Sequence, residues 1–211
     1  MVLKFDKLEV VEMRLKNLIF ATLILAVLGK GCGLLSYGQE SRVGTLNVQN
    51  SPTVPSQNIA IGLADQVLGG IVVEVGGEET VEAMNFDIVI GLASPEGPFP
   101  DIDDITNIVM VDDEGRIMAG PVDGAVGGNN AVRFIDTVTF KTGKHTYTLR
   151  CRLSADFSVN DQITISTIPS SDWTAVRGVV SGNTITPSPS SVVVLSTMTA
   201  KSTFLRVIEP I

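Results

Sequence analysis

The stretch VRFIDTVTFKTGKHTYTLRCRLSADF, residues 132–157, alternates apolar and polar side chains more regularly than any other part of the chain. In its second half the apolar face carries Tyr147, Leu149, Cys151 and Leu153. The opposite, polar face carries Thr148, Arg150 and Arg152. In the first half the expected inward residues are Val132, Phe134, Val138 and Phe140. A two-residue period is typical of a strand with one buried and one solvent-exposed side.

A short polar segment, residues 141–144 (KTGK), separates the two halves of this stretch. Its glycine can adopt positive φ, which tight turns require. We therefore predict that the two halves pair directly as an antiparallel hairpin. A register irregularity is expected around Ile135 and Asp136, where the alternation is interrupted.

Strand patterns and turn signals repeat along the rest of the chain. Further strands are expected at residues 58–63, 71–75, 81–92, 108–111, 116–119, 162–167, 172–180 and 192–208. Gly69-Gly70, residues 76–79 and residues 112–115 are interpreted as turns between them. No window of 11 or more residues after the N-terminal region has helical periodicity. The pattern predicts an all-β domain, a two-sheet antiparallel sandwich of eight to ten strands over residues 58–211.

Composition limits the classes of partner. The chain has 211 residues, of which 44% are hydrophobic, enough for a sizeable core. Its formal net charge is −8. An acidic surface repels phosphates, so we expect neither nucleic acid nor an anionic membrane surface as a partner.

The N-terminal region has the features of an export signal. Arg14 and Lys16 precede an apolar run at residues 18–28, and Met13 is a second candidate start. The run is shorter than the roughly 20 residues of a membrane-spanning helix and fits a signal peptide cleaved after Gly38. Two alternatives are lipidation at Cys32 and an uncleaved anchor or pilin-like helix. Residues 1–38 are thus a signal peptide or N-terminal anchor, and the location is extracellular or at the cell surface, with membrane contact only if this segment is retained.

Residues 39–57 are polar and contain Pro52 and Pro55, which interior strands rarely accommodate. We predict an extended segment that lies on a neighbouring subunit, with Val43, Leu46 and Val48 as subunit contacts. The alternative is that this segment forms the first strand of its own sandwich.

Two acidic groups are candidate calcium ligands: Asp101, Asp103 and Asp104 in one loop, and Asp112 and Asp113 in a turn. If the sandwich brings these loops together, their oxygens suit Ca²⁺. The alternative is that both groups are solvated loops.

The residues offer little for catalysis. His145 is the only histidine and lies next to a predicted turn, and no G-x-S-x-G motif is present. Gly-rich residues 69–77 and 120–128 lack the Gly-Lys-Ser/Thr end of a phosphate loop. Cys151 and Trp173 are expected in the core. We therefore predict that the protein is not an enzyme and has no cofactor other than calcium.

The order of NIVMVDDEGRIMAGP (residues 107–121), the 132–157 stretch with its continuation to Ile165, and DWTAVRGVVSGNTIT (172–186) resembles the Ig-like β-sandwich modules of predicted bacterial surface proteins. The resemblance covers roughly residues 45–200. It implies an Ig-like sandwich with an extracellular structural or adhesive role, and it supplies no catalytic residues. We therefore expect a secreted structural protein that assembles with itself into a filament or surface layer. The alternative is a monomeric adhesin or glycan-binding module.

Overall fold

The computed structural model describes residues 44–95, 100–124 and 130–203. The first sheet has the strand order β1-β3-β10-β6-β7, the second sheet β2-β13-β11-β5-β8 and the small sheet β12-β4-β9. The strands of the first sheet are β1 Thr45–Asn50, β3 Gln66–Gly76, β10 Gly143–Leu153, β6 Ile105–Val111 and β7 Ile117–Val122. Those of the second are β2 Asn58–Ala60, β13 Val193–Lys201, β11 Gln162–Thr167, β5 Phe86–Ala93 and β8 Ala131–Phe134. Those of the small sheet are β12 Arg177–Gly178, β4 Val81–Ala83 and β9 Val138–Phe140.

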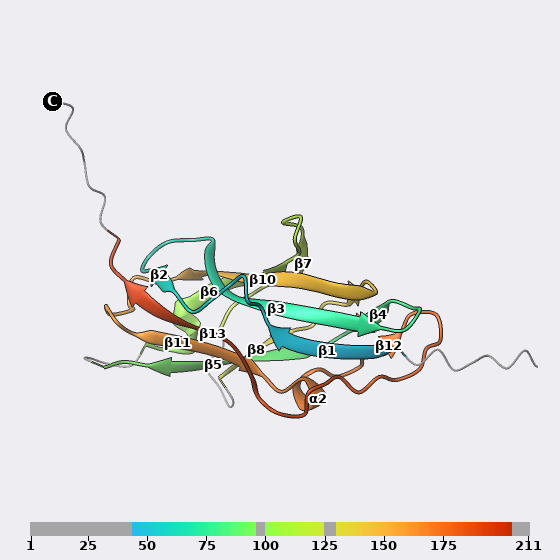
Figure 1. Ribbon diagram of the computed structural model, residues 1–211. Helices are drawn as coiled ribbons and strands as arrows, with labels where there is room; N and C mark the ends of the chain where they lie inside the picture. The colour runs from blue at the N-terminus through green and yellow to red at the C-terminus, as the bar shows by residue number, and fades with distance from the viewer. Residues whose placement is uncertain (1–43, 96–99, 125–129, 204–211) are drawn as a thin grey trace, which may run out of the picture. The chain divides into compact units, whose positions relative to one another are not determined.

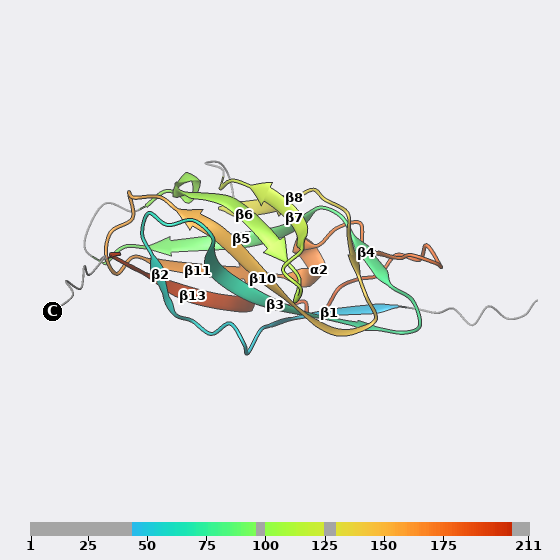
Figure 2. The same ribbon diagram turned by 90° about the horizontal axis from the view of Figure 1, so that it is seen from above.

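The prediction of an all-β two-sheet sandwich is confirmed. Figures 1 and 2 show the two larger sheets as facing layers. All strand pairs are antiparallel except β2 with β13. Two short helices occur in the described part of the chain, η1 Ile102–Asp104 and α2 Pro169–Asp172. The strand at 162–167 and the hairpin of β6 and β7 are also confirmed.

Strand β10 lies at the centre of the first sheet, between β3 and β6. Its predicted inward residues are all buried, with exposed fractions of 4% or less: Tyr147, Leu149, Cys151 and Leu153. The same is true of the four predicted inward residues before the turn, Val132, Phe134, Val138 and Phe140. The alternation therefore identified the core face correctly.

The predicted hairpin is wrong, because the two halves of the stretch do not pair with each other. β8 pairs with β5, β9 with β4, and β10 with β3 and β6. At residues 135–137 the chain passes from β8 of the second sheet to β9 of the small sheet. The chain between β4 and β5 passes between the same two sheets at Asn85, where φ is +54°. Two paired strands thus bend together, and the predicted strand at 81–92 is divided into β4 and β5.

The interpretation of Gly69-Gly70 as a turn is also wrong, since both residues lie inside β3. A Cβ atom at Gly70 would lie 2.6 Å from Ser51 Cβ, and one at Gly69 would lie 2.1 Å from Ile165 Cδ1. Glycine inside a strand often marks a close approach of neighbouring atoms. Gly69 faces the second sheet, and Gly70 faces the segment after β1.

The N-terminal extended segment belongs to the sandwich. β1 pairs along its whole length with β3, and Leu46 and Val48 are 1% and 0% exposed inside their own chain. Their predicted role as subunit contacts is therefore wrong, and the domain does not begin at residue 58. β1 is an edge strand, a position that tolerates the prolines after it. Val43 lies outside the described residues.

The strand predicted at 172–180 is replaced by the end of α2 and the two-residue β12. Pro169 begins the helix at a position where its missing N–H costs nothing. Within the described residues no helix is long and apolar enough to cross a membrane. The predicted signal or anchor, with Cys32, lies outside those residues.

Candidate functional site: a groove beside the edge strand

The predicted calcium site does not form, because the two acidic groups lie at opposite ends of β6. Asp101, Asp103 and Asp104 precede this strand, and Asp112 and Asp113 follow it. A seven-residue strand separates them by roughly 23 Å at 3.3 Å per residue. One ion cannot bridge that distance. No cluster of three or more potential metal ligands occurs among the residues that the structure describes.

The carboxylate of Asp112 instead closes its own turn. It accepts hydrogen bonds from the backbone N–H of Glu114 at 3.0 Å and of Arg116 at 2.9 Å, and from Arg116 Nε at 2.8 Å. Burial opposes ionisation, but these bonds and the guanidinium together lower the pKa of Asp112. The turn's contribution to stability is therefore present above the ordinary Asp pKa and is lost as the pH falls through the lowered value.

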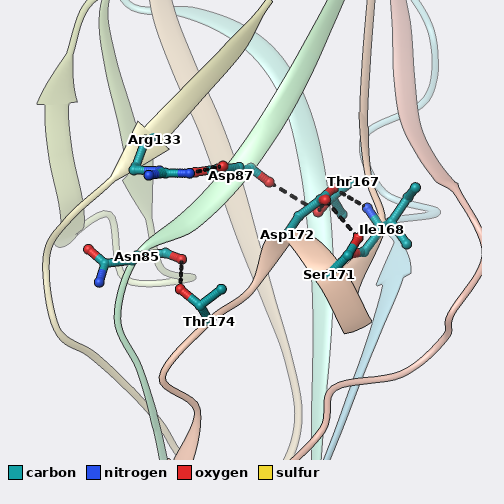
Figure 3. Close-up of polar contacts among 8 residues, drawn as sticks. All are labelled: Asn85, Asp87, Arg133, Thr167, Ile168, Ser171, Asp172 and Thr174. Carbon is teal, nitrogen blue, oxygen red and sulfur yellow. Dashed lines mark hydrogen bonds and ion pairs between the residues drawn. The ribbon is translucent and has the colours of Figure 1, made fainter. Parts of the chain in front are cut away.

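A second polar cluster surrounds α2 (Figure 3). Asp172 accepts hydrogen bonds from Ile168 N and from Ser171 Oγ, and Thr167 Oγ1 donates to the carbonyl of Asp87 at 3.1 Å. On the solvent face Arg133 donates twice to the Asp87 carboxylate, each time at 2.7 Å. These partners join β5, β8, β11 and α2 to one another. The cluster therefore stabilises the fold next to the residues where the chain crosses between the second sheet and the small sheet.

Neither His145 nor Cys151 is arranged as a nucleophile or base. His145 Nε2 lies 3.0 Å from the Thr142 carbonyl, beside the turn before β10. Cys151 is 1% exposed, and burial raises the pKa of its thiol to about 12. The reactive form of a thiol is the thiolate.

Native Cys151 is therefore expected to react with iodoacetamide at pH 8 at least about 1000-fold more slowly than in the unfolded chain, since raising the thiol pKa from about 9 to about 12 removes that much thiolate. Mass spectrometry of labelled protein with and without urea measures the ratio. Labelling at similar rates in both conditions would contradict the burial of this side chain.

A groove lies beside β1 on the surface of the sandwich. Its volume is about 420 Å³, and it is lined by Asn47, Val48, Gln49, Asn50, Pro189, Ser191, Val192, Val193 and Val194. One wall is therefore the edge strand of the first sheet, and the other is the chain entering β13 of the second. Figures 1 and 2 show the end of β1 next to the start of β13. None of the lining side chains is ionisable.

Two apolar side chains of this groove are open to solvent. Val192 is 57% exposed and Val194 is 52% exposed, whereas Val48 beside them is fully buried. Both exposed valines lie on one wall, two residues apart, as side chains on the same face of a strand do. Together they form an exposed apolar strip that faces a strand edge.

The backbone of β1 is only partly paired on this side. Val48 N donates to the Ser188 carbonyl at 2.8 Å, and Ser188 N donates to the Leu46 carbonyl at 2.9 Å. Alternate residues of a strand direct their N–H and C=O groups to the same side, so Val48 C=O and Asn50 N–H also point away from β3. Neither has a hydrogen-bond partner in the described ranges. The groove thus offers one acceptor and one donor spaced as in a strand ladder.

The sequence alone did not reveal this groove. Its two walls lie more than 135 positions apart in the chain, and the run of three valines at 192–194 does not reveal which of them face solvent. The useful signal was weaker: residues 186–191, TPSPSS, are rich in proline and serine, which is typical of a loop and not of a strand that pairs along its whole length. Pro189 lies directly after the last bonded residue.

No family model and no curated protein matches this chain. Among solved structures, the chain is similar to a type III cohesin module from the cellulosomal ScaE cell-surface anchoring scaffoldin of Ruminococcus flavefaciens. The identity is 12%, the match covers 81% of this chain and 93% of the cohesin module, and the TM-score is 0.27. A similarity this low supports no argument about function, so the fold described above rests on strand pairing alone.

Proposed function

We propose that the protein is a non-enzymatic structural module, secreted or held at the cell surface, that binds an extended segment of another protein chain in the groove beside β1. The observation that carries this proposal is the combination of unpaired β1 backbone groups with the exposed strip of Val192 and Val194. An added strand gains main-chain hydrogen bonds from such an edge and register from apolar pockets beside it.

Association between copies is the simplest use of this edge. The function proposed is assembly of the sandwich into a filament or layer, with each copy lending a strand to the next. An isolated strand edge is a template for pairing that folded proteins otherwise cover. The acidic charge of −8 opposes unspecific clustering, which favours contact at this uncharged groove. A monomeric adhesin that binds a foreign segment there is the competing outcome of the experiment below.

A double substitution tests the groove: Val192→Arg with Val194→Arg. Covering the exposed parts of two valines contributes on the order of 2 kcal/mol, so the variant is expected to weaken self-association about 30-fold. Sedimentation velocity over a concentration series measures this. The matched control is Val180→Arg, which changes a valine that is 76% exposed in the 178–183 turn, and it should associate like the unmodified chain.

Two results would count against the proposal. One is self-association of the double variant at the strength of the unmodified chain. The other is a chain that stays monomeric and binds no extended peptide at all.

A further inference from the structure

We infer that the occupant of the groove is the segment Phe204–Glu209 of a second copy of this chain. The inference rests on the proposed function, since it names the strand that the groove would take. Three features support this occupant: the chemistry of the segment, the distance between the groove and the end of β13, and the elements that already flank β13.

The segment after β13 reads FLRVIE, followed by Pro210. Phe, Val and Ile favour strands, and Leu205 and Val207 fall on one face of an extended chain. Arg206 and Glu209 cancel, so the segment has no net charge. This matches a groove without ionisable lining side chains. Pro210 has no N–H and would end the pairing.

The same copy cannot place this segment in its own groove. β13 begins at the groove with Val193 and ends at Lys201, so the groove and the start of the segment are separated by about 26 Å along the strand. Figure 1 shows the end of β13 at the end of the sandwich opposite to the start of β1. Phe204 follows Lys201 by three residues, which span at most about 10 Å.

A return path along β13 is also blocked. β2 pairs with residues 199–201 on one side, and β11 pairs with residues 193–199 on the other. Ile61 N and Thr199 N already use hydrogen bonds on the β2 side, to Lys201 O and Gln57 O at 2.9 Å each. The groove of the same copy is therefore out of reach of the segment, and a second copy is the chain whose groove can receive it.

This contact is heterologous, because it joins the segment of one copy to the groove of the next. Such a contact generates a ring if the rotation closes and an open fibre if it does not. The groove lies beside the start of β13 and the segment follows the end of β13 in the chain, so each copy supplies one segment and one groove. Assembly by this route is therefore repetitive without requiring β1 to leave its own sheet.

The test changes the segment within the full chain. Leu205→Glu with Val207→Glu is expected to weaken self-association at least about tenfold, because it adds two negative charges, beside Glu209, to the face that would enter a groove without charged side chains. Arg206→Gln, on the opposite face, is the matched control and should change association less than about twofold. Thermal unfolding should be the same in all three, since these substitutions change no residue of the strands described above.

A labelled peptide of residues 203–211 provides a direct measurement. It should bind the Leu205→Glu, Val207→Glu chain in fluorescence anisotropy, and it should not bind a chain that also carries Val192→Arg and Val194→Arg. Unchanged association of the segment variant, or equal peptide binding by both chains, would overturn the inference. If the groove variant alone abolishes association, the proposed function survives and only the occupant is wrong; if neither variant affects it, both fail.

Discussion

Replacing Trp173 by alanine is expected to lower the free energy of unfolding by about 3–5 kcal/mol. The Trp173 side chain is 2% exposed, and its ring lies 4.9 Å from Phe86 and 5.7 Å from Phe140 between centroids. Phe86 stacks on Phe134 at 5.0 Å. Phe140 meets Tyr147 edge to face at 5.3 Å. This row of rings connects all three sheets, and the alanine variant loses the ring contacts with Phe86 of the second sheet and Phe140 of the small sheet.

The matched control is Trp173→Phe, which keeps a ring but removes the indole N–H that donates to Thr167 Oγ1 at 3.1 Å. A smaller loss, about 1–2 kcal/mol, is expected for this variant. Urea denaturation followed by circular dichroism measures the free energy of unfolding of both variants. In thermal unfolding, the alanine variant should melt about 10 °C lower than the unmodified chain. A cost below about 1 kcal/mol for the alanine variant would contradict a central role for this ring.

Removing the buried carboxylate of Glu79 is expected to have the second-largest effect, about 2–3 kcal/mol for Glu79→Ala. Glu79 is 3% exposed and accepts hydrogen bonds from Val180 N at 2.9 Å, Ser181 N at 2.8 Å and Ser181 Oγ at 2.6 Å. It therefore anchors the turn at residues 178–183 to the chain before β4. Without it, these donors lose their acceptor.

Glu79→Gln separates the hydrogen bonds from the shape of the side chain. Glutamine keeps one acceptor oxygen and replaces the other by a donor, so it should recover roughly half of the loss. Position 178 itself has no room for a side chain, since a Cβ there would lie 2.2 Å from Glu79 Oε1. Equal stability of the glutamine variant and the unmodified chain would show that this network contributes little.

If the groove assembles copies, the two largest stability effects should be separable from assembly. Trp173 and Glu79 act inside one copy, whereas Val192 and Val194 are exposed valines on its surface. A groove variant should therefore unfold at the same urea concentration as the unmodified chain while it associates less. The two classes of variant thus distinguish folding from binding.

The sequence by itself determined which side chains are inside. Alternation along a strand is a local property of the backbone, so the buried faces of β5, β8, β9, β10 and β11 could be predicted from the sequence alone. The same local reasoning placed Trp173 and Cys151 in the core, and both are buried. The all-β fold followed from that period and from the turn residues between the strands.

Only the tertiary structure decided which strands are neighbours. β10 pairs with β3, whose paired residues lie 68 to 85 positions earlier, and not with β9, the strand next to it in sequence. The two acidic groups, whose shared calcium site required the fold to bring them together, lie at opposite ends of β6, and the segment predicted to lie on a neighbouring subunit pairs with β3. The groove joins residues 47–50 to 189–194. Strand pairing, sheet crossing and surface grooves depend on contacts between distant segments, and a two-residue period contains no information about them.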